Sequence, residues 1–185
     1  MIAIGVLLLV AQGAATPSPL TPLQRLNARI PVDAVLEVQP HKLAGQYTSS
    51  SQELVKRMGG FLSGNDLYLF PDGTYIYCEW ADIQPTTIYD RGKWTFRNGF
   101  VGLTSDAEIT GNPGAERKYE VVRRRFHPAE VLLIGIKDDL EHFEEMTKGD
   151  PELNLLIVGK QRSKALNPKQ ARALKAKLIR EDWRP

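Results

Sequence analysis

The side chains of this sequence that could do chemistry form no known catalytic pattern. Its histidines, His41, His127 and His142, fall in a proline-rich segment, a turn and an expected helix. Serine hydrolysis needs a serine with a base and an orienting acid, but the sequence has no Gly-x-Ser-x-Gly elbow and nothing that pairs a serine with a histidine. Glycine loops of the phosphate-binding type are also missing. We therefore predict that the protein is not an enzyme.

Metal binding is a second function that histidine and carboxylate side chains could have. Glu145 follows His142 by three positions and Asp139 precedes it by three, so the three side chains share one face of an expected helix. Metal sites with Glu-x-x-His spacing use two copies of the motif, whereas this sequence holds one. A closed zinc site cannot be assembled from one cysteine and scattered histidines. We predict no metal and no cofactor.

Carboxylates leave one enzymatic alternative open. Glu79, Asp82 and Asp90 lie in the central expected strands or in the loop between them. Glycoside hydrolysis requires two carboxylates, which are recognised by their separation in space. Sequence spacing does not show that separation.

Aromatic and arginine side chains on expected strands are the best candidates for binding. Aromatic walls with few polar groups are typical of small-molecule pockets. The planar guanidinium group binds anions through paired hydrogen bonds. The sequence thus predicts a site for a small apolar or anionic ligand. The alternative is that the aromatics are core residues and that the arginines pair with carboxylates on neighbouring strands. The predicted ligand-binding residues are Tyr47, Trp80, Trp94, Arg123 and Arg125.

The single cysteine is expected to be structural. Strand alternation places Cys78 on the same face as Ile76 and Trp80. A buried cysteine behaves as a small hydrophobic residue. One cysteine also cannot form a disulfide within the chain.

Hydrophobic alternation and turn residues predict a succession of short strands. Pro71-Asp72-Gly73 and Asn98-Gly99 predict tight turns between them. Within 88–97, Trp94 and Phe96 fall on the face expected to be buried, and Lys93 and Thr95 on the face expected to be wet. The predicted strands are 43–48, 67–70, 74–80, 88–97, 100–104, 118–126, 130–137 and 153–158.

Helices are expected in two connections and at the end of the chain. Ser50 and Glu53 have the spacing of a capping box, and glycines at 59–60 end that helix. A second short helix is expected to begin near 138–139. Asn167 as N-cap and Pro168 at the first position start a terminal helix over 168–182. Its apolar stripe consists of Ala171, Leu174 and Leu178.

A meander of short hairpins must protect its edge strands, and closure of the sheet does so. We therefore predict a mainly β fold: an antiparallel up-and-down barrel or strongly curled sheet of about eight strands, with two short helices and a C-terminal helix. The alternative is a two-sheet β-sandwich.

The order of these elements resembles lipocalin-like (calycin-like) β-barrels. Gly45-Gln46-Tyr47 stands where lipocalins carry Gly-x-Trp near the first strand, and a helix follows the last strand. The likeness spans about 43–183. The segments 69–75, 92–94 and 99–103 also resemble uncharacterised secreted β-proteins of bacteria. These resemblances imply a barrel, and the second implies no activity.

The N-terminus has the order of a secretory signal. Residues 1–15 carry no charged side chain, and the apolar run 2–10 is too short to cross a bilayer as a helix. Small residues at 13–15 and a proline-rich segment follow. We expect a signal peptide over 1–15 and an extracytoplasmic (secreted or periplasmic) protein, the alternative being a buried N-terminal element. Residues 16–40 predict an extended arm, and 41–185 predict a single β-rich domain with no transmembrane segment.

Positive charge is concentrated at the C-terminus. Residues 160–185 hold nine basic and two acidic side chains, although the whole chain has a net charge of only +2. A basic helix can contact an anionic envelope surface, or it can be a solvated face. The sequence thus favours a secreted or periplasmic, non-catalytic protein that binds a small ligand. The alternative is an envelope structural or interaction protein that uses this helix. The expected export argues against nucleic acid as a partner.

Overall fold

A computed structural model describes residues 32–60, 63–106, 116–125, 127–136 and 150–181. The expected signal peptide, most of the arm, and the helix that contains His142 lie outside these ranges. The strands are β1 Val32–Ala34, β2 Gly45–Thr48, β3 Ser63–Leu69, β4 Thr74–Ala81, β5 Gln84–Arg97, β6 Phe100–Ser105, β7 Glu116–Arg124, β8 His127–Gly135 and β9 Lys160–Ala165. The helices are η1 Pro40–Lys42 (a 3-10 turn), α2 Gln52–Met58, α5 Pro151–Val158 and α6 Pro168–Glu181.

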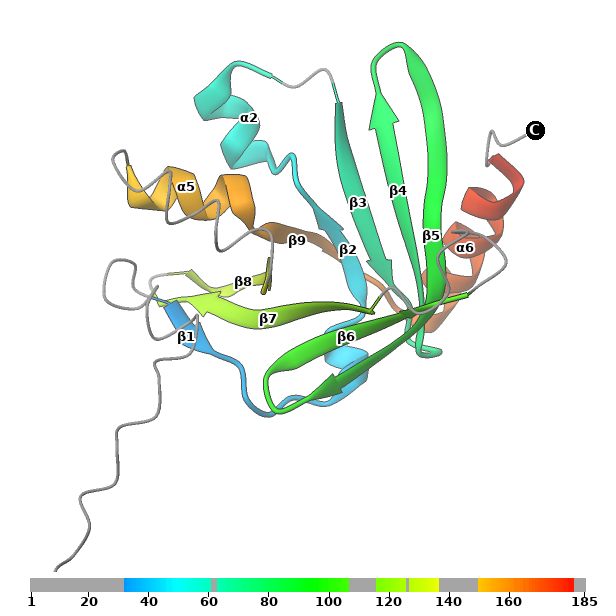
Figure 1. The fold of residues 1–185 in the computed structure, drawn as a ribbon, viewed down its shortest axis with the longest axis horizontal. Coiled ribbons are helices and arrows are strands. Elements are labelled where there is room, and N and C mark those ends of the chain that lie inside the picture. The colour runs from blue at the N-terminus through cyan, green and yellow to red at the C-terminus, as the bar shows by residue number, and fades with distance from the viewer. Residues whose placement is uncertain (1–31, 61–62, 107–115, 126, 137–149, 182–185) are drawn as a thin grey trace, which may run out of the picture.

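Eight of these strands close into an antiparallel barrel (Figure 1). Each strand from β2 to β8 pairs with the next one along the chain, and β9 pairs with β2. The short strand β1 lies outside this ring and pairs with the end of β7. The predicted mainly β fold with a closed up-and-down barrel and a C-terminal helix is therefore confirmed, and the sandwich alternative is not adopted.

The inward faces of the strands form an aromatic and aliphatic core. Trp94 is 5% exposed, and its indole N–H donates to the Phe70 carbonyl oxygen at 2.9 Å. Phe96 packs against this core, whereas Lys93 and Thr95 are exposed, as the alternation predicts. The core residues are Val35, Leu43, Tyr47, Leu67, Leu69, Tyr75, Tyr77, Trp94, Val101, Leu103, Tyr119, Val121, Val131 and Leu133.

Helices cover two patches of the outer surface of the barrel, on opposite sides in Figure 1. The helix α6 buries Ala171 and Leu178 against Ile76, Cys78 and other residues of β3–β5. Helices α2 and α5 cover β7 and β8 with an apolar cluster of their own. The two clusters explain why both faces of several strands are apolar.

The structure differs from the sequence-based expectation in the region that closes the barrel. Residues 153–158, predicted as a strand, belong to helix α5. Asp150 caps this helix by accepting a hydrogen bond from the Glu152 backbone N–H at 2.9 Å, and proline occupies its first turn. A short apolar run fits a buried helix as well as a buried strand. The strand that closes the ring is instead the polar segment β9.

The cap of α2 is also displaced by one residue from its predicted position. Ser51, rather than Ser50, accepts the hydrogen bond from the Leu54 N–H at 3.2 Å. Ser50 lies in the preceding turn, where its hydroxyl contacts that of Thr48. The predicted helix end at Gly59 is confirmed. Because serine occupies both positions, the residue types alone do not show which of the two caps the helix.

The burial of Cys78 leads to a labelling prediction. The Cys78 thiol is fully buried beneath α6, so Ellman's reagent should modify it at least about a hundredfold more slowly in the native protein than in urea. Leu178→Asp, which places a charge at the helix contact, should accelerate the reaction. Ala173→Asp on the exposed side of α6 is the control. Rapid native labelling would contradict this packing.

Candidate functional site

One end of the sheet extends beyond the closed part of the barrel. Strand β5 pairs with β6 only from Gly92 to Arg97, so its first half pairs with β4 alone among the described strands. Strands β3, β4 and β5 rise together from the rest of the molecule in Figure 1. Near their end, Ile83 is 91% exposed and Tyr89 is 53% exposed. This extension therefore presents both sheet surface and apolar side chains to solvent.

A hollow of about 310 Å³ lies along this extension. That volume is at the lower end of the range, about 300–1,000 Å³, of small-molecule sites. We refer to it as the β3–β5 hollow. Its lining residues are Ser63, Gly64, Asn65, Glu79, Trp80, Ala81, Gln84, Pro85, Thr87 and Tyr89.

Trp80 is among the lining residues, but its side chain points to the face of the sheet opposite to that of its chain neighbour Glu79. Gly64 is its cross-strand partner. A Cβ atom at Gly64 would lie only 2.5 Å from Cζ2 of the indole, so the ring lies against the glycine backbone. Glycine within a strand permits such a close approach. Trp80 is half-buried and keeps part of its surface accessible.

Polar groups align across the three strands at the same level. Asn65 is directly opposite Glu79, and Glu79 is directly opposite Thr87, so the three side chains share one face of the sheet. The Lys160 ammonium donates to the Asn65 side-chain oxygen at 2.5 Å. Because lysine only donates, the Asn65 amide nitrogen must point away from this contact. The two N–H groups of the Asn65 amide therefore point away from Lys160.

Two of the predicted ligand residues lie inside the barrel. Tyr47 is fully buried and its hydroxyl donates to the Leu43 carbonyl oxygen at 2.8 Å. Burial raises the pKa of Tyr47 well above its ordinary value, although the charge and hydrogen bond of Arg162 lower it. Trp94 is part of the same interior. These two rings pack within the core and do not line the β3–β5 hollow.

The two predicted arginines lie at the far end of β7. Arg123 is exposed and is in register with Asp33 of β1. Arg125 is 52% exposed, and its guanidinium lies 3.0 Å from a carboxylate oxygen of Asp33. Of the five predicted residues, the structure places only Trp80 at the hollow and does not bring the five together. Their role in ligand binding stays a prediction.

The carboxylates considered for glycoside hydrolysis occupy different environments. Glu79 lines the hollow and is exposed, and Asp82 is exposed in the β4–β5 turn. Asp90 is buried, and it accepts hydrogen bonds from the Tyr75 hydroxyl at 2.8 Å and from the Ser105 hydroxyl. Asp90 therefore has a structural role in joining β4, β5 and β6.

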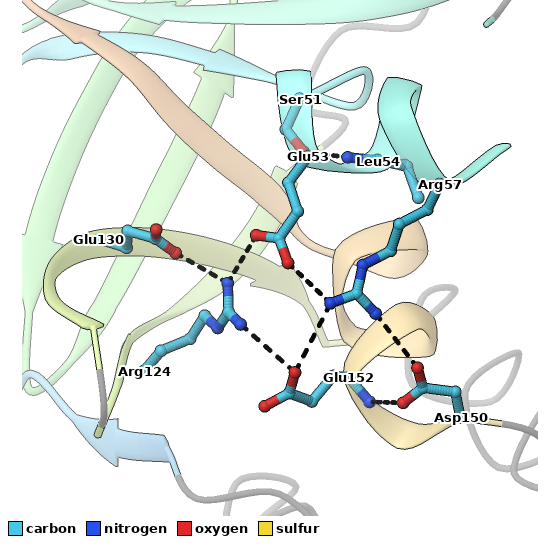
Figure 2. Close-up of polar contacts among 8 residues, drawn as sticks. All are labelled: Ser51, Glu53, Leu54, Arg57, Arg124, Glu130, Asp150 and Glu152. Carbon is cyan, nitrogen blue, oxygen red and sulfur yellow. Dashed lines mark hydrogen bonds and ion pairs between the residues drawn. The ribbon is translucent and has the colours of Figure 1, made fainter. Parts of the chain in front are cut away.

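An ion cluster connects helices α2 and α5 to the barrel (Figure 2). Arg124 of β7 is 5% exposed and lies 2.9 Å from Glu53, 3.0 Å from Glu130 and 3.6 Å from Glu152. Arg57 bridges Glu53 and the capping residue of α5. Sequence analysis missed this cluster because its members come from four separate elements.

The pKa values of this cluster follow from its charges. Burial raises the pKa of Glu53, but the hydrogen bonds and charges of Arg124 and Arg57 outweigh burial and leave this pKa below its ordinary value. For Arg124, burial lowers the pKa, and the carboxylates of Glu53 and Glu130 outweigh it and raise the pKa above its ordinary value. The cluster is thus held in its charged form, and its contacts are typical of structural ion pairs.

The basic helix α6 keeps several cations on its outer side. Lys175 contacts Asp72 at 3.0 Å, whereas Lys169, Arg172, Lys177 and Arg180 are exposed. Contact with an anionic envelope surface stays a prediction. None of the helices within the described ranges combines the length and hydropathy that a membrane span requires. Among the described side chains, no group of three or more His, Cys, Asp or Glu residues is placed to hold a metal ion.

The fold and the hollow together define a closed eight-stranded antiparallel barrel with a candidate site on its extended strands. Comparison with known proteins finds no match to a family model, to a curated protein or to a solved structure. The function must therefore be argued from the site itself.

Proposed function

We propose that this protein is an extracytoplasmic, non-catalytic binding protein that holds a small ligand in the β3–β5 hollow. The observation that carries the proposal is the hollow itself, which is lined by residues of β3, β4 and β5 and of the turn between β4 and β5. Concave sites of about this size are typical of small-molecule binding. The proposed extracytoplasmic location rests on the signal-like sequence of residues 1–15.

The hollow, rather than the barrel interior, is the better candidate for the site. Interior positions of the described strands are filled by large side chains, among them Tyr47, Tyr75 and Trp94. Small barrels with filled interiors have packed cores instead of ligand cavities. The closed barrel supports a lipocalin-like architecture, but with the site moved outward onto the extended strands.

The lining of the hollow favours an uncharged polar ligand. Glu79 is the one charged residue among the described lining residues. The arginines expected to hold an anion lie at the end of β7, and Arg125 pairs with Asp33 there. Glu79 and the Lys160 ammonium, which contacts the lining residue Asn65, place charges of both signs at the hollow, so an ion of either sign would meet a like charge there.

Native mass spectrometry of the protein purified from its natural source tests this proposal. We expect the wild-type protein to carry a co-purifying small molecule and Trp80→Ala to lose it, because Trp80 is one of the residues that line the hollow. Trp94→Phe is the matched control and should keep the molecule, since Trp94 lies inside the barrel. A ligand-free wild-type protein, or equal occupancy in Trp80→Ala, would reject the proposal.

A further inference from the structure

We propose that the outward face of helix α6 binds the surface of a bilayer that contains anionic lipid. This binding surface is separate from the β3–β5 hollow and does not depend on a ligand there. Helix α6 spans Pro168–Glu181 and lies along the outside of the barrel, on the side opposite to α2 and α5 (Figure 1). The total charge of this segment does not distinguish a docking surface from a solvated face, but the placement of its side chains favours docking.

The inner face of α6 is occupied by its contact with the barrel. Ala171 and Leu178 are buried in the cluster that also contains Cys78. At the edge of this face, the Lys175 ammonium lies 3.0 Å from the Asp72 carboxylate. These contacts hold the helix in one rotational orientation, so the same side chains always face away from the barrel.

The face opposite to this contact carries cations and small side chains. Positions i, i+4, i+7 and i+11 of an α-helix lie along one line of its surface. Counted from Lys169, this line contains Ala173, Ala176 and Arg180, and all four residues are exposed. The two alanines add little bulk between the two cations, so the line can closely approach a flat surface.

Two further exposed cations, Arg172 and Lys177, flank this line. Glu181, the one acidic residue of α6, lies 3.7 Å from Lys177 and 4.0 Å from Arg180. Exposed ion pairs of this kind are weak, because water screens them. With four exposed cations and one carboxylate, the outward surface of the helix therefore keeps a net positive charge.

An apolar side chain beside the cations favours a bilayer over an acidic macromolecule in water. Ile179 is 46% exposed. It follows Arg172 by seven positions, so the two side chains lie on the same side of the helix. Helices that lie in the interfacial plane of a membrane combine basic residues with apolar side chains that enter the headgroup layer. A soluble polyanion has no such layer to receive Ile179.

The distribution of charge along the chain would orient the protein on such a surface. Residues 160–185 are strongly basic, whereas the remaining residues are net acidic, since the whole chain has a net charge of only +2. A negative surface therefore attracts the α6 side and repels the acidic remainder. This attraction acts within a Debye length and weakens as salt is added.

Co-sedimentation with lipid vesicles tests the proposal. The protein should sediment with vesicles of equal parts phosphatidylcholine and phosphatidylglycerol, and not with vesicles of phosphatidylcholine alone. Raising NaCl from about 0.1 M to about 0.5 M should release it. Lys169→Glu, which reverses one charge of the outward face, should weaken the partition coefficient at least about tenfold. Ile179→Ser should weaken binding further without removing its dependence on salt.

Lys56→Glu is the matched control, because Lys56 is exposed on α2 and the change in net charge is the same. It should leave the partition coefficient within about twofold of wild type. Slow labelling of Cys78 in each variant checks that α6 is still packed on the barrel. Equal losses for Lys169→Glu and Lys56→Glu would overturn the proposal. Failure to bind the anionic vesicles would also overturn it, and binding of soluble polyglutamate in that case would assign the face to an acidic protein instead.

Discussion

Replacing Trp94 by alanine is expected to destabilise the protein by about 3–5 kcal/mol, as for other large aromatic residues removed from a core. The side chain is 5% exposed and packs among the interior residues of the barrel. Its loss creates a cavity and removes the donor to the Phe70 carbonyl oxygen. Urea denaturation followed by far-ultraviolet circular dichroism measures the free energy of unfolding.

Two other variants serve as comparisons for Trp94→Ala. One tests the hydrogen bond of Trp94 apart from its packing, and the other tests a tryptophan outside the core. Trp94→Phe keeps most of the ring volume but loses the N–H donor, so we expect a loss of about 1–2 kcal/mol. Trp80→Ala removes a half-buried ring at the extended strands and should cost about 1 kcal/mol. An equal loss for Trp80→Ala and Trp94→Ala would show that the core is not where the structure places it.

Replacing Arg124 by methionine is expected to cost about 2–3 kcal/mol at pH 7. Removal of one partner from a buried ion pair costs about 3–5 kcal/mol. The carboxylates here are 30% to 46% exposed, so water screens part of their mutual repulsion. Methionine keeps the hydrocarbon volume, which limits the loss to the charge contacts of Glu53, Glu130 and Glu152.

The neighbouring arginine provides the matched control. Arg125 is 52% exposed and pairs with Asp33 on the surface. Surface pairs contribute about 0–1 kcal/mol, so Arg125→Met should be nearly neutral. Stability is measured as urea midpoints under the same conditions for both variants. Similar losses for Arg124→Met and Arg125→Met would contradict the conclusion that the buried ion cluster stabilises the contact of α2 and α5 with the barrel.

The loss in Arg124→Met should also depend on pH. The pKa of Glu53 is lower in the native state than its ordinary value of 4.5. Its contribution to stability is therefore fully present above pH 4.5 and is lost as the pH falls through the lowered native pKa. The difference in unfolding free energy between wild type and Arg124→Met should shrink from pH 7 to about pH 3. A difference that stays constant over this range would rule out the electrostatic explanation.

Several features of the fold could be predicted because they depend on residues adjacent in the chain. Asn98 and Gly99 both have positive φ, 51° and 85°, as the predicted hairpin turn requires. Asn167 caps α6 by accepting from the Gln170 N–H at 2.9 Å. Alternation along β5 correctly turns Trp94 inward. Each of these outcomes is determined within a few residues.

The candidate site was only partly predictable for the same reason. Aromatic composition identified Trp80 as a candidate, and the structure places it in the hollow. Tyr47 and Trp94 have the same chemistry but belong to the core. Asn65 and Thr87 became candidates only when their cross-strand register with Glu79 was known.

The sequence by itself determined the local elements: the turns, the capped terminal helix, the alternating strands and hence a mainly antiparallel β fold. Only the tertiary structure decided that the polar segment Lys160–Ala165 closes the barrel and that residues 151–158 form a helix beside it. Strand β9 pairs with β2 along most of its length and with β8 at its first two residues, and this gain in backbone hydrogen bonds is not encoded by local propensity. The ion cluster and the β3–β5 hollow likewise arise from segments far apart in the chain, whose contacts exist only after the barrel has closed.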